Sequence, residues 1–202
     1  MNQQVLAGIV ILLCIICLLV YYKTTSFLRP WGIALFIIAI SALCLRLSQI
    51  NKAIAWFHSE TIFQSVLIIL IPALIFISFL LVNNKLTNSK RHYFMILLPL
   101  YVFFGALQQI FFLVVFTDSL SILFNDNIVV LVGGWIYFVL FHLNWGKLKL
   151  MKYFPFLVLF GFLNVYIYIV WENILPQLLI HGVVGSVLFA THKSIDQVKY
   201  RL

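Results

Sequence analysis

Two histidines and a pair of glutamines are the residues of this chain whose types and placing could do chemistry. His142 follows Phe138 by four positions near the end of one apolar segment, and His181 lies in the last apolar segment. Gln108 and Gln109 precede both histidines, in an earlier segment. An imidazole can exchange a proton near neutral pH, and an amide can hold a water molecule or a peptide group by hydrogen bonds. The set therefore predicts a polar site inside an apolar environment.

The composition indicates which elements must position these side chains. Of the 202 residues, 64% are hydrophobic and only 9% are charged, whereas about a quarter of the residues in a soluble domain are charged. A membrane-spanning helix needs about 20 mainly apolar residues. Apolar runs that could form such helices lie at about residues 4–21, 31–46, 61–82, 93–117, 127–145, 153–171 and 174–191. We therefore expect an all-α, polytopic transmembrane helix bundle of about seven spans, with residues 1–202 as a single integral membrane domain.

The basic residues predict the orientation of the spans. Arg46 and Lys52 are the only two of the 13 Lys and Arg residues on one side of the predicted topology. The other 11 lie in four alternate segments, at residues 21–30, 83–92, 146–152 and 192–202. By the positive-inside rule, the N-terminus is outside and the C-terminus is cytoplasmic. The connection at 118–126, which we expect to be an acidic loop, then lies outside.

The net charge of +8 is explained by this topology, because the basic residues are spread over short connections. We therefore expect the lipid bilayer as a partner and no nucleic acid.

The first apolar run lacks a preceding basic segment and a small-residue cleavage site, which favours a retained span over a signal peptide. Cys14, Cys17 and Cys44 lie in apolar runs and are expected to be buried. Short loops favour the bacterial inner (cytoplasmic) membrane.

Polar side chains inside the spans need a reason, because burying them in lipid is costly. Asn164 lies in the sixth apolar run and Gln177 in the seventh, where Gly182 and Gly185 follow. Hydrogen bonds between helices and close helix approach account for single residues of this kind. Two histidines on separate spans, together with a glutamine pair, instead favour one shared polar cavity.

The order and spacing of these residues resemble the CPBP family, the CAAX-protease and bacteriocin-processing (Abi-type) intramembrane endopeptidases. That family has a Glu-Glu-x-x-x-Arg motif, a Phe-x-x-x-His motif and a final His-x-x-x-Asn or His-x-x-x-Asp motif. Phe138 and His142 match the second motif, and His181 matches the first position of the third. His142 lies 34 residues after Gln108 and 39 residues before His181, which is similar to the family's separations. The resemblance covers residues 93–191, roughly half of the chain.

The resemblance implies which residues would form the site. The implied catalytic residues are Gln108, Gln109, His142 and His181. The implied substrate-binding residues are Phe138, Asn144 and Gly185. In the family, the motif glutamate is thought to activate water. Here both positions of the glutamate pair are glutamine, which cannot accept a proton at any useful pH. Leu113 replaces the arginine, and Gly185 replaces the final Asn or Asp. The implied protein is a divergent member, with impaired catalysis or a pseudoprotease role, that binds a membrane peptide or a lipidated chain.

Three further considerations bear on this site. His142 and His181 alone leave a divalent metal ion short of ligands, so no cofactor is expected. Glu172 could act as a base, but nine helical residues place it about 13 Å from His181 along the axis. The predicted spans place His181 near mid-membrane and His142 near the cytoplasmic end, which separates the rings by about 10 Å in depth.

Two other functional classes remain open for the same sequence. A small membrane transporter or lipid-handling protein could use the intramembrane polar residues as a pathway, although no chain of ionisable residues marks one. A structural subunit of a membrane complex would explain the short connections between spans. If the chain is instead a CPBP-like protein, as the resemblance implies, its expected partner is a membrane protein or a lipidated peptide.

Overall fold

The computed structural model describes residues 2–23, 32–39, 59–83, 88–143, 151–171 and 174–191. Within these ranges only residues 2, 125, 126 and 174 lie outside helices, and there is no strand. The predicted all-α fold class is therefore confirmed for the described part. Four helical stretches there are long and apolar enough to span a membrane, namely Gln3–Lys23, Phe63–Asn83, Tyr101–Phe124 and Phe154–Trp171. These stretches indicate a membrane protein.

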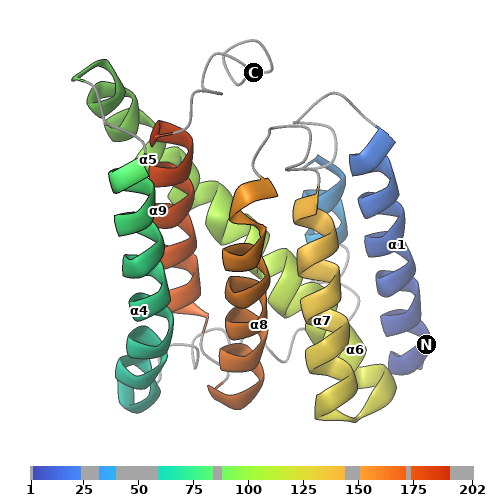
Figure 1. The fold of residues 1–202 in the computed structure, drawn as a ribbon. Helices are drawn as coiled ribbons and strands as arrows, with labels where there is room; N and C mark the ends of the chain where they lie inside the picture. The colour runs from blue at the N-terminus through green and yellow to red at the C-terminus, as the bar shows by residue number, and fades with distance from the viewer. Residues whose placement is uncertain are drawn as a thin grey trace.

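The helices lie side by side in a bundle (Figure 1). The elements with assigned bounds are, in chain order, α1 (Gln3–Lys23), α4 (Ser59–Asn83), α5 (Asn88–Gln109), η1 (Ile110–Thr117), α6 (Asp118–Phe124), α7 (Asn127–His142), η3 (Met151–Tyr153), α8 (Phe154–Trp171) and α9 (Leu175–Thr191). Helices α1, α4, α7 and α9 run toward the end of the bundle at which α8 begins, which we call the upper end. The α5–η1–α6 stretch and α8 run back toward the lower end. Helix α9 packs against α4 and α5, and α7 packs against α8.

Helix α5, η1 and α6 form one continuous helical stretch at the centre of the bundle. Its middle section, Ile110–Thr117, is a π-helix of eight residues. The Thr117 hydroxyl donates to the carbonyl oxygen of Phe112, five residues earlier, at 2.8 Å. Residues 111–117 are all buried, and η1 contacts α1, α7 and α8. The core of the bundle therefore surrounds this π-helix, an element that is frequent at functional sites.

The prediction of a loop at residues 118–126 is wrong, because the helix continues to Phe124. The carboxylate of Asp118 accepts a hydrogen bond from the Tyr168 hydroxyl on α8, at 2.9 Å to either oxygen. Ser119 donates to the carbonyl oxygen of Val115 within its own helix. Asp118 is half-buried, and a carboxylate partly removed from water is tolerated where it has a hydrogen-bonding partner. The helix can therefore continue through Asp118, where the sequence alone indicated the end of a span.

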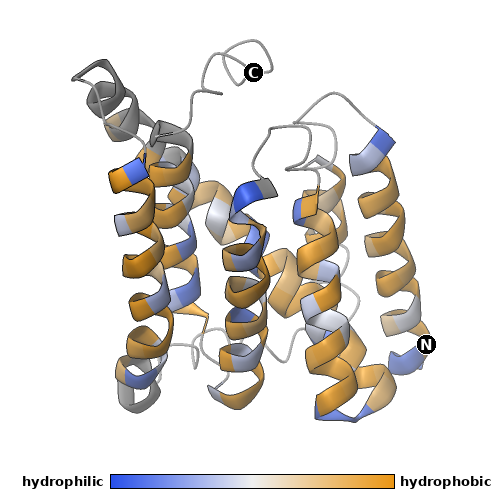
Figure 2. Ribbon diagram, in the orientation of Figure 1, coloured by the Kyte–Doolittle hydropathy of each residue, from blue (hydrophilic) through white to orange (hydrophobic). Residues whose placement is uncertain are grey.

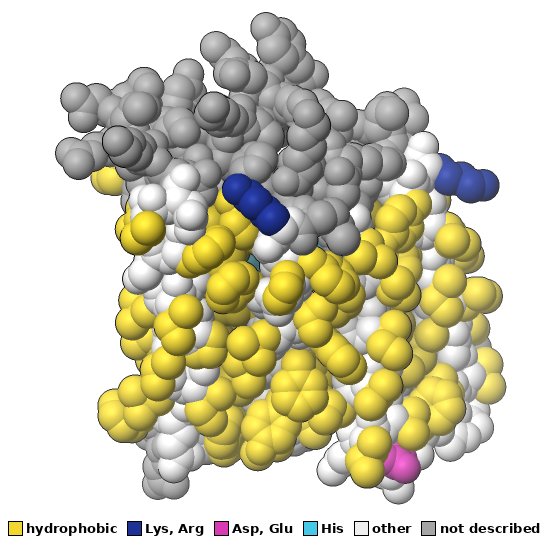
Figure 3. Space-filling model, in the orientation of Figure 1, with side chains coloured by type: hydrophobic (Ala, Val, Ile, Leu, Met, Phe, Trp, Pro, Cys, Tyr) yellow, Lys and Arg dark blue, Asp and Glu magenta, His cyan; other side chains and the backbone are white. Residues whose placement is uncertain are grey.

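The surface of the bundle is apolar along its sides and charged at its ends. Hydrophobic residues dominate the outer helices (Figure 2), and apolar side chains cover the face shown in Figure 3. Exposed aliphatic side chains such as Leu12 on α1 and Ile71 on α4 suit lipid better than water. Among the described residues, exposed Lys23 ends α1 and exposed Lys152 precedes α8 at the upper end, and exposed Asp126 caps α7 at the lower end.

Glycines bring α5 and α9 into backbone contact. A Cβ atom added to Gly105 would lie 3.1 Å from the backbone nitrogen of Gly182, and one added to Gly182 would lie 2.5 Å from Cα of Val102. A Cβ on Gly185 would meet the Tyr101 ring at 2.9 Å. Small residues permit such close helix contacts in membranes. The close approach expected at Gly182 and Gly185 therefore occurs, and it holds α9 against the helix that carries the glutamine pair.

Candidate functional site

Gln109 and His181 meet where α5 passes into the π-helix. Nε2 of the Gln109 amide lies 2.5 Å from Nδ1 of His181, although 72 residues separate them in the chain. The Gln109 side chain is fully buried. Gly105 lies one turn earlier, and a Cβ there would come within 3.4 Å of the His181 ring. The glycine contact between α5 and α9 therefore positions this pair.

His142 has a fixed ring orientation at the end of α7. Its Nδ1 lies 2.8 Å from the carbonyl oxygen of Phe138, one turn earlier. A carbonyl oxygen can only accept, so Nδ1 carries the proton that it donates, and in the neutral ring Nε2 is the basic nitrogen. The ring also stacks on Phe138, with centroids 4.3 Å apart. Both interactions hold the imidazole in one direction.

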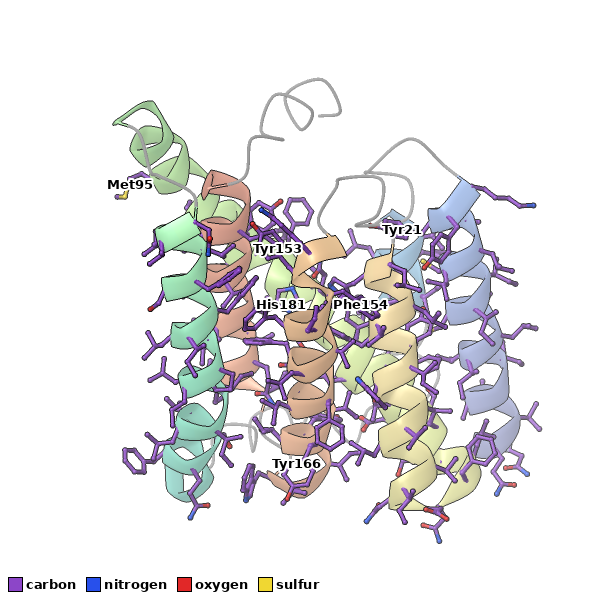
Figure 4. The ribbon with its side chains drawn as sticks, viewed as in Figure 1. Tyr21, Met95, Tyr153, Phe154, Tyr166 and His181 are labelled. Carbon is purple, nitrogen blue, oxygen red and sulfur yellow. The ribbon has the colours of Figure 1, made fainter. Side chains whose placement is uncertain are left out.

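The two imidazoles lie close together, with ring centroids 6.0 Å apart. The expected separation in depth of about 10 Å is therefore wrong. The physical reason is that α9 begins inside the bundle, where Ile174 is 1% and Gln177 is 0% exposed. Figure 1 shows the lower end of α9 well above the lower ends of α7 and α8. His181 consequently reaches the upper half of the bundle, much nearer to the level of Tyr153 than to that of Tyr166 (Figure 4).

Aromatic rings surround these polar groups. The Phe138 ring lies 6.2 Å from His181 and 5.3 Å from Phe112, and Phe112 lies 5.7 Å from His142. Gly161 on α8 makes room for Phe138, because a Cβ there would lie 2.5 Å from the ring. Apolar surroundings strengthen hydrogen bonds and make unpaired polar atoms costly. Neither Phe112 nor Gly161 was predicted, since nothing in the sequence distinguishes them among 20 phenylalanines and nine glycines.

The positions of the family's first motif differ in their surroundings. Gln109 is buried, whereas Gln108 is half-buried. Consecutive helical residues lie about 100° apart around the axis, so the two side chains leave the helix in different directions. Leu113, which stands where the family has arginine, is fully buried in an apolar cluster. Gln109 is therefore the glutamine that reaches the histidines.

The residues implied to bind substrate are distributed unevenly. Phe138 contacts both histidine rings. Gly185 lies against Tyr101 of α5, one turn above His181. Asn144 lies outside the described residues. Of this group, Phe138 is the residue that the structure places in direct contact with the histidine pair.

The carboxylates whose side chains the structure describes are engaged away from the histidine pair. The carboxylate of Asp118 is bonded to Tyr168, and that of Asp126 caps the lower end of α7. Glu172 falls outside the described ranges, and within them no three His, Cys, Asp or Glu residues gather as metal ligands. Two imidazoles supply too few donors for a divalent ion.

One atom of the site has no hydrogen-bond partner in the described part of the chain, and this is the buried Oε1 of Gln109. Leaving such an acceptor unpaired costs about 1–3 kcal/mol. The amide can therefore accept a hydrogen bond from a ligand while its nitrogen contacts His181.

Comparison of the chain with models of protein families, with curated proteins and with solved structures gives no match.

Proposed function

We propose that this chain is a divergent CPBP-like intramembrane protein that binds a polar group of a membrane peptide or a lipidated chain at Gln109, His142 and His181. The hydrogen bond between Gln109 and His181, with the His142 ring 6.0 Å away, supports this most directly. The three residues come from segments that correspond, in order, to the three motifs of the family. Their meeting in the bundle is what a shared site requires.

Binding without cleavage suits these residues better than hydrolysis does. A peptidase that activates water needs a base near the scissile carbonyl. Gln109 replaces the carboxylate of the family with a neutral amide, and the described carboxylates, Asp118 and Asp126, are engaged elsewhere. An amide and two imidazoles can still hold a peptide group by hydrogen bonds. We therefore propose a pseudoprotease or catalytically impaired member.

We further propose seven spans, with the N-terminus outside and the C-terminus cytoplasmic, in a bacterial inner membrane. The directions of the helices alternate from α4 to α9 in Figure 1, which supports this topology, as does the helical state of residues 32–39 within the second apolar run. The exposed Lys23 and Lys152 lie at the upper end, and Asp126 lies at the lower end. Under the positive-inside rule the upper end faces the cytoplasm. The histidine pair then lies in the cytoplasmic half of the membrane.

A binding assay with reconstituted protein tests the function. Two photo-cross-linkable probes are titrated in liposomes, a short farnesylated peptide and an unlipidated transmembrane peptide. We expect saturable cross-linking of at least one probe, weakened about tenfold by Gln109→Ala or His181→Ala because a buried hydrogen-bonding group is lost. Ser186→Ala is the control, because this buried hydroxyl on α9 donates to the Gly182 carbonyl of its own helix. If neither probe saturates, or if His181→Ala binds as tightly as the unmodified protein, the proposal fails.

A further inference from the structure

Two more amides are buried inside the bundle with unpaired polar atoms. Asn164 on α8 and Gln177 on α9 are both 0% exposed. Oδ1 of Asn164 and both Oε1 and Nε2 of Gln177 have no hydrogen-bond partner within the described chain. Nδ2 of Asn164 donates to the Phe160 carbonyl at 2.7 Å, which leaves its oxygen as an acceptor. At membrane depth each unpaired group is costly, so these atoms need a polar partner.

Each amide lies about one helical turn below a residue that neighbours the Phe138 ring. The Phe138 ring lies between Gly161 of α8 and His181 of α9. Helix α8 runs downward from Gly161 to Asn164, and α9 runs upward from Gln177 to His181 (Figure 1). Three or four helical residues amount to about one turn, or about 5 Å. Asn164 and Gln177 therefore lie one turn below Phe138 on antiparallel helices.

Apolar side chains close this level from below. Val165 and Tyr168 of α8 belong to one buried cluster with Ile174, which directly precedes α9, and with residues of the π-helix. Aromatic rings lie above the amides, and this apolar cluster lies beneath them. A polar group that reaches these amides from the histidine pair would enter from above, because the apolar cluster closes the lower side.

We propose that Asn164 and Gln177 form a subsite that binds the main chain of an extended peptide segment. This inference rests on the proposed function, because the same peptide would engage His142 and His181 one turn above. The N–H and C=O of one residue in an extended strand point to the same side, so a primary amide can pair with both at once. Gln177 offers that donor and acceptor, and the oxygen of Asn164 can accept an adjacent N–H.

The chemistry of the unpaired atoms selects an extended peptide over other ligands. A metal cation would engage the oxygens but leave Nε2 of Gln177 unpaired. A lipid tail would leave all three atoms of Asn164 and Gln177 unpaired. The main-chain groups of a helical peptide are already bonded within the helix, so only an unwound segment can supply partners. The subsite therefore distinguishes unwound from helical peptide.

An amide-to-ester scan of the peptide probe tests the subsite. Each main-chain N–H of the cross-linking peptide is replaced in turn by an ester oxygen, which removes one donor. We expect one or two positions at which the ester weakens binding to the unmodified protein about tenfold. Each sensitive ester is expected to have no effect on binding to the variant that lacks its acceptor, which is either Asn164→Leu or Gln177→Leu.

Stability measurements separate lost binding from lost folding. Without peptide, Gln177→Leu and Gln177→Met are expected to keep or raise the Tm in detergent, because each removes an unpaired buried amide. Ser186→Ala keeps the ester sensitivity of the unmodified protein. Three results would overturn the subsite and leave the proposed function standing. They are an ester scan in which no position changes the affinity, ester sensitivity that persists in both Leu variants, and a lower Tm for both Gln177 variants. Absence of saturable binding to the unmodified protein overturns both.

Discussion

Gln109 and His181 contact each other at 2.5 Å across 72 residues of sequence, and the contact depends on how α5 packs against α9. Gly105 lies one turn before Gln109, and Gly182 directly follows His181. At these two glycines the backbones of the helices touch. The polar pair is therefore only as stable as the glycine contact beside it.

Gly182→Ala tests that dependence. The new methyl group would lie 2.5 Å from Cα of Val102, a backbone atom that cannot rotate away. We expect a loss of about 1–3 kcal/mol in the free energy of unfolding, measured in detergent, together with weaker probe binding. Gly8→Ala is the matched control, because a Cβ at Gly8 has no atom within 4 Å and alanine favours a helix by up to about 1 kcal/mol. Equal effects of the two substitutions would contradict the close packing.

Gly161→Ala tests the support of the Phe138 ring, which lies beside both histidines. A Cβ at Gly161 would lie 2.5 Å from the Phe138 ring, which also stacks on His142. We expect a destabilisation of about 1–3 kcal/mol, partly reversed when Phe138→Leu is added to make room. The free energies of unfolding of the two single variants and the double variant give the coupling. Strict additivity would show that the two residues do not press on each other.

Helix positions could be predicted from the sequence because a chain in lipid must satisfy its backbone within helices. The end of the fourth span could not, since Asp118 signals a loop until its bond to Tyr168, 50 residues away, is known. The depth of His181 could not either, because it depends on where α9 begins inside the bundle. Asn164 and Gln177 were visible as intramembrane amides, but the sequence does not reveal that they lack partners.

Gln109→Glu tests whether the missing base explains the proposed lack of cleavage. A carboxylate at this position would accept a hydrogen bond from His181 and could activate a water molecule. We expect slow cleavage of the bound probe by Gln109→Glu, or by the double variant Gln108→Glu/Gln109→Glu, detected by mass spectrometry. Adding His181→Ala should abolish that cleavage. Efficient cleavage by the unmodified protein would show instead that the pseudoprotease assignment is wrong.

The orientation of the bundle can be tested by labelling from one side of the membrane. Lys152 and Asp126 are exposed at opposite ends, so each is replaced by cysteine in a variant whose native cysteines are changed to alanine. In intact cells, a membrane-impermeant maleimide should label Asp126→Cys and not Lys152→Cys. Permeabilised cells should show both. The reverse pattern in intact cells would contradict a cytoplasmic upper end.

A double-mutant cycle on probe affinity tests the central claim most directly, because it asks whether Gln109 and His181 act as one binding unit. The dissociation constant of the cross-linking peptide is measured for the unmodified protein, Gln109→Ala, His181→Ala and the double variant. If the two side chains hold the ligand together, the coupling energy should reach at least about 1 kcal/mol, so that the double variant binds little worse than either single variant. Effects that add to within about 0.3 kcal/mol would contradict a shared site.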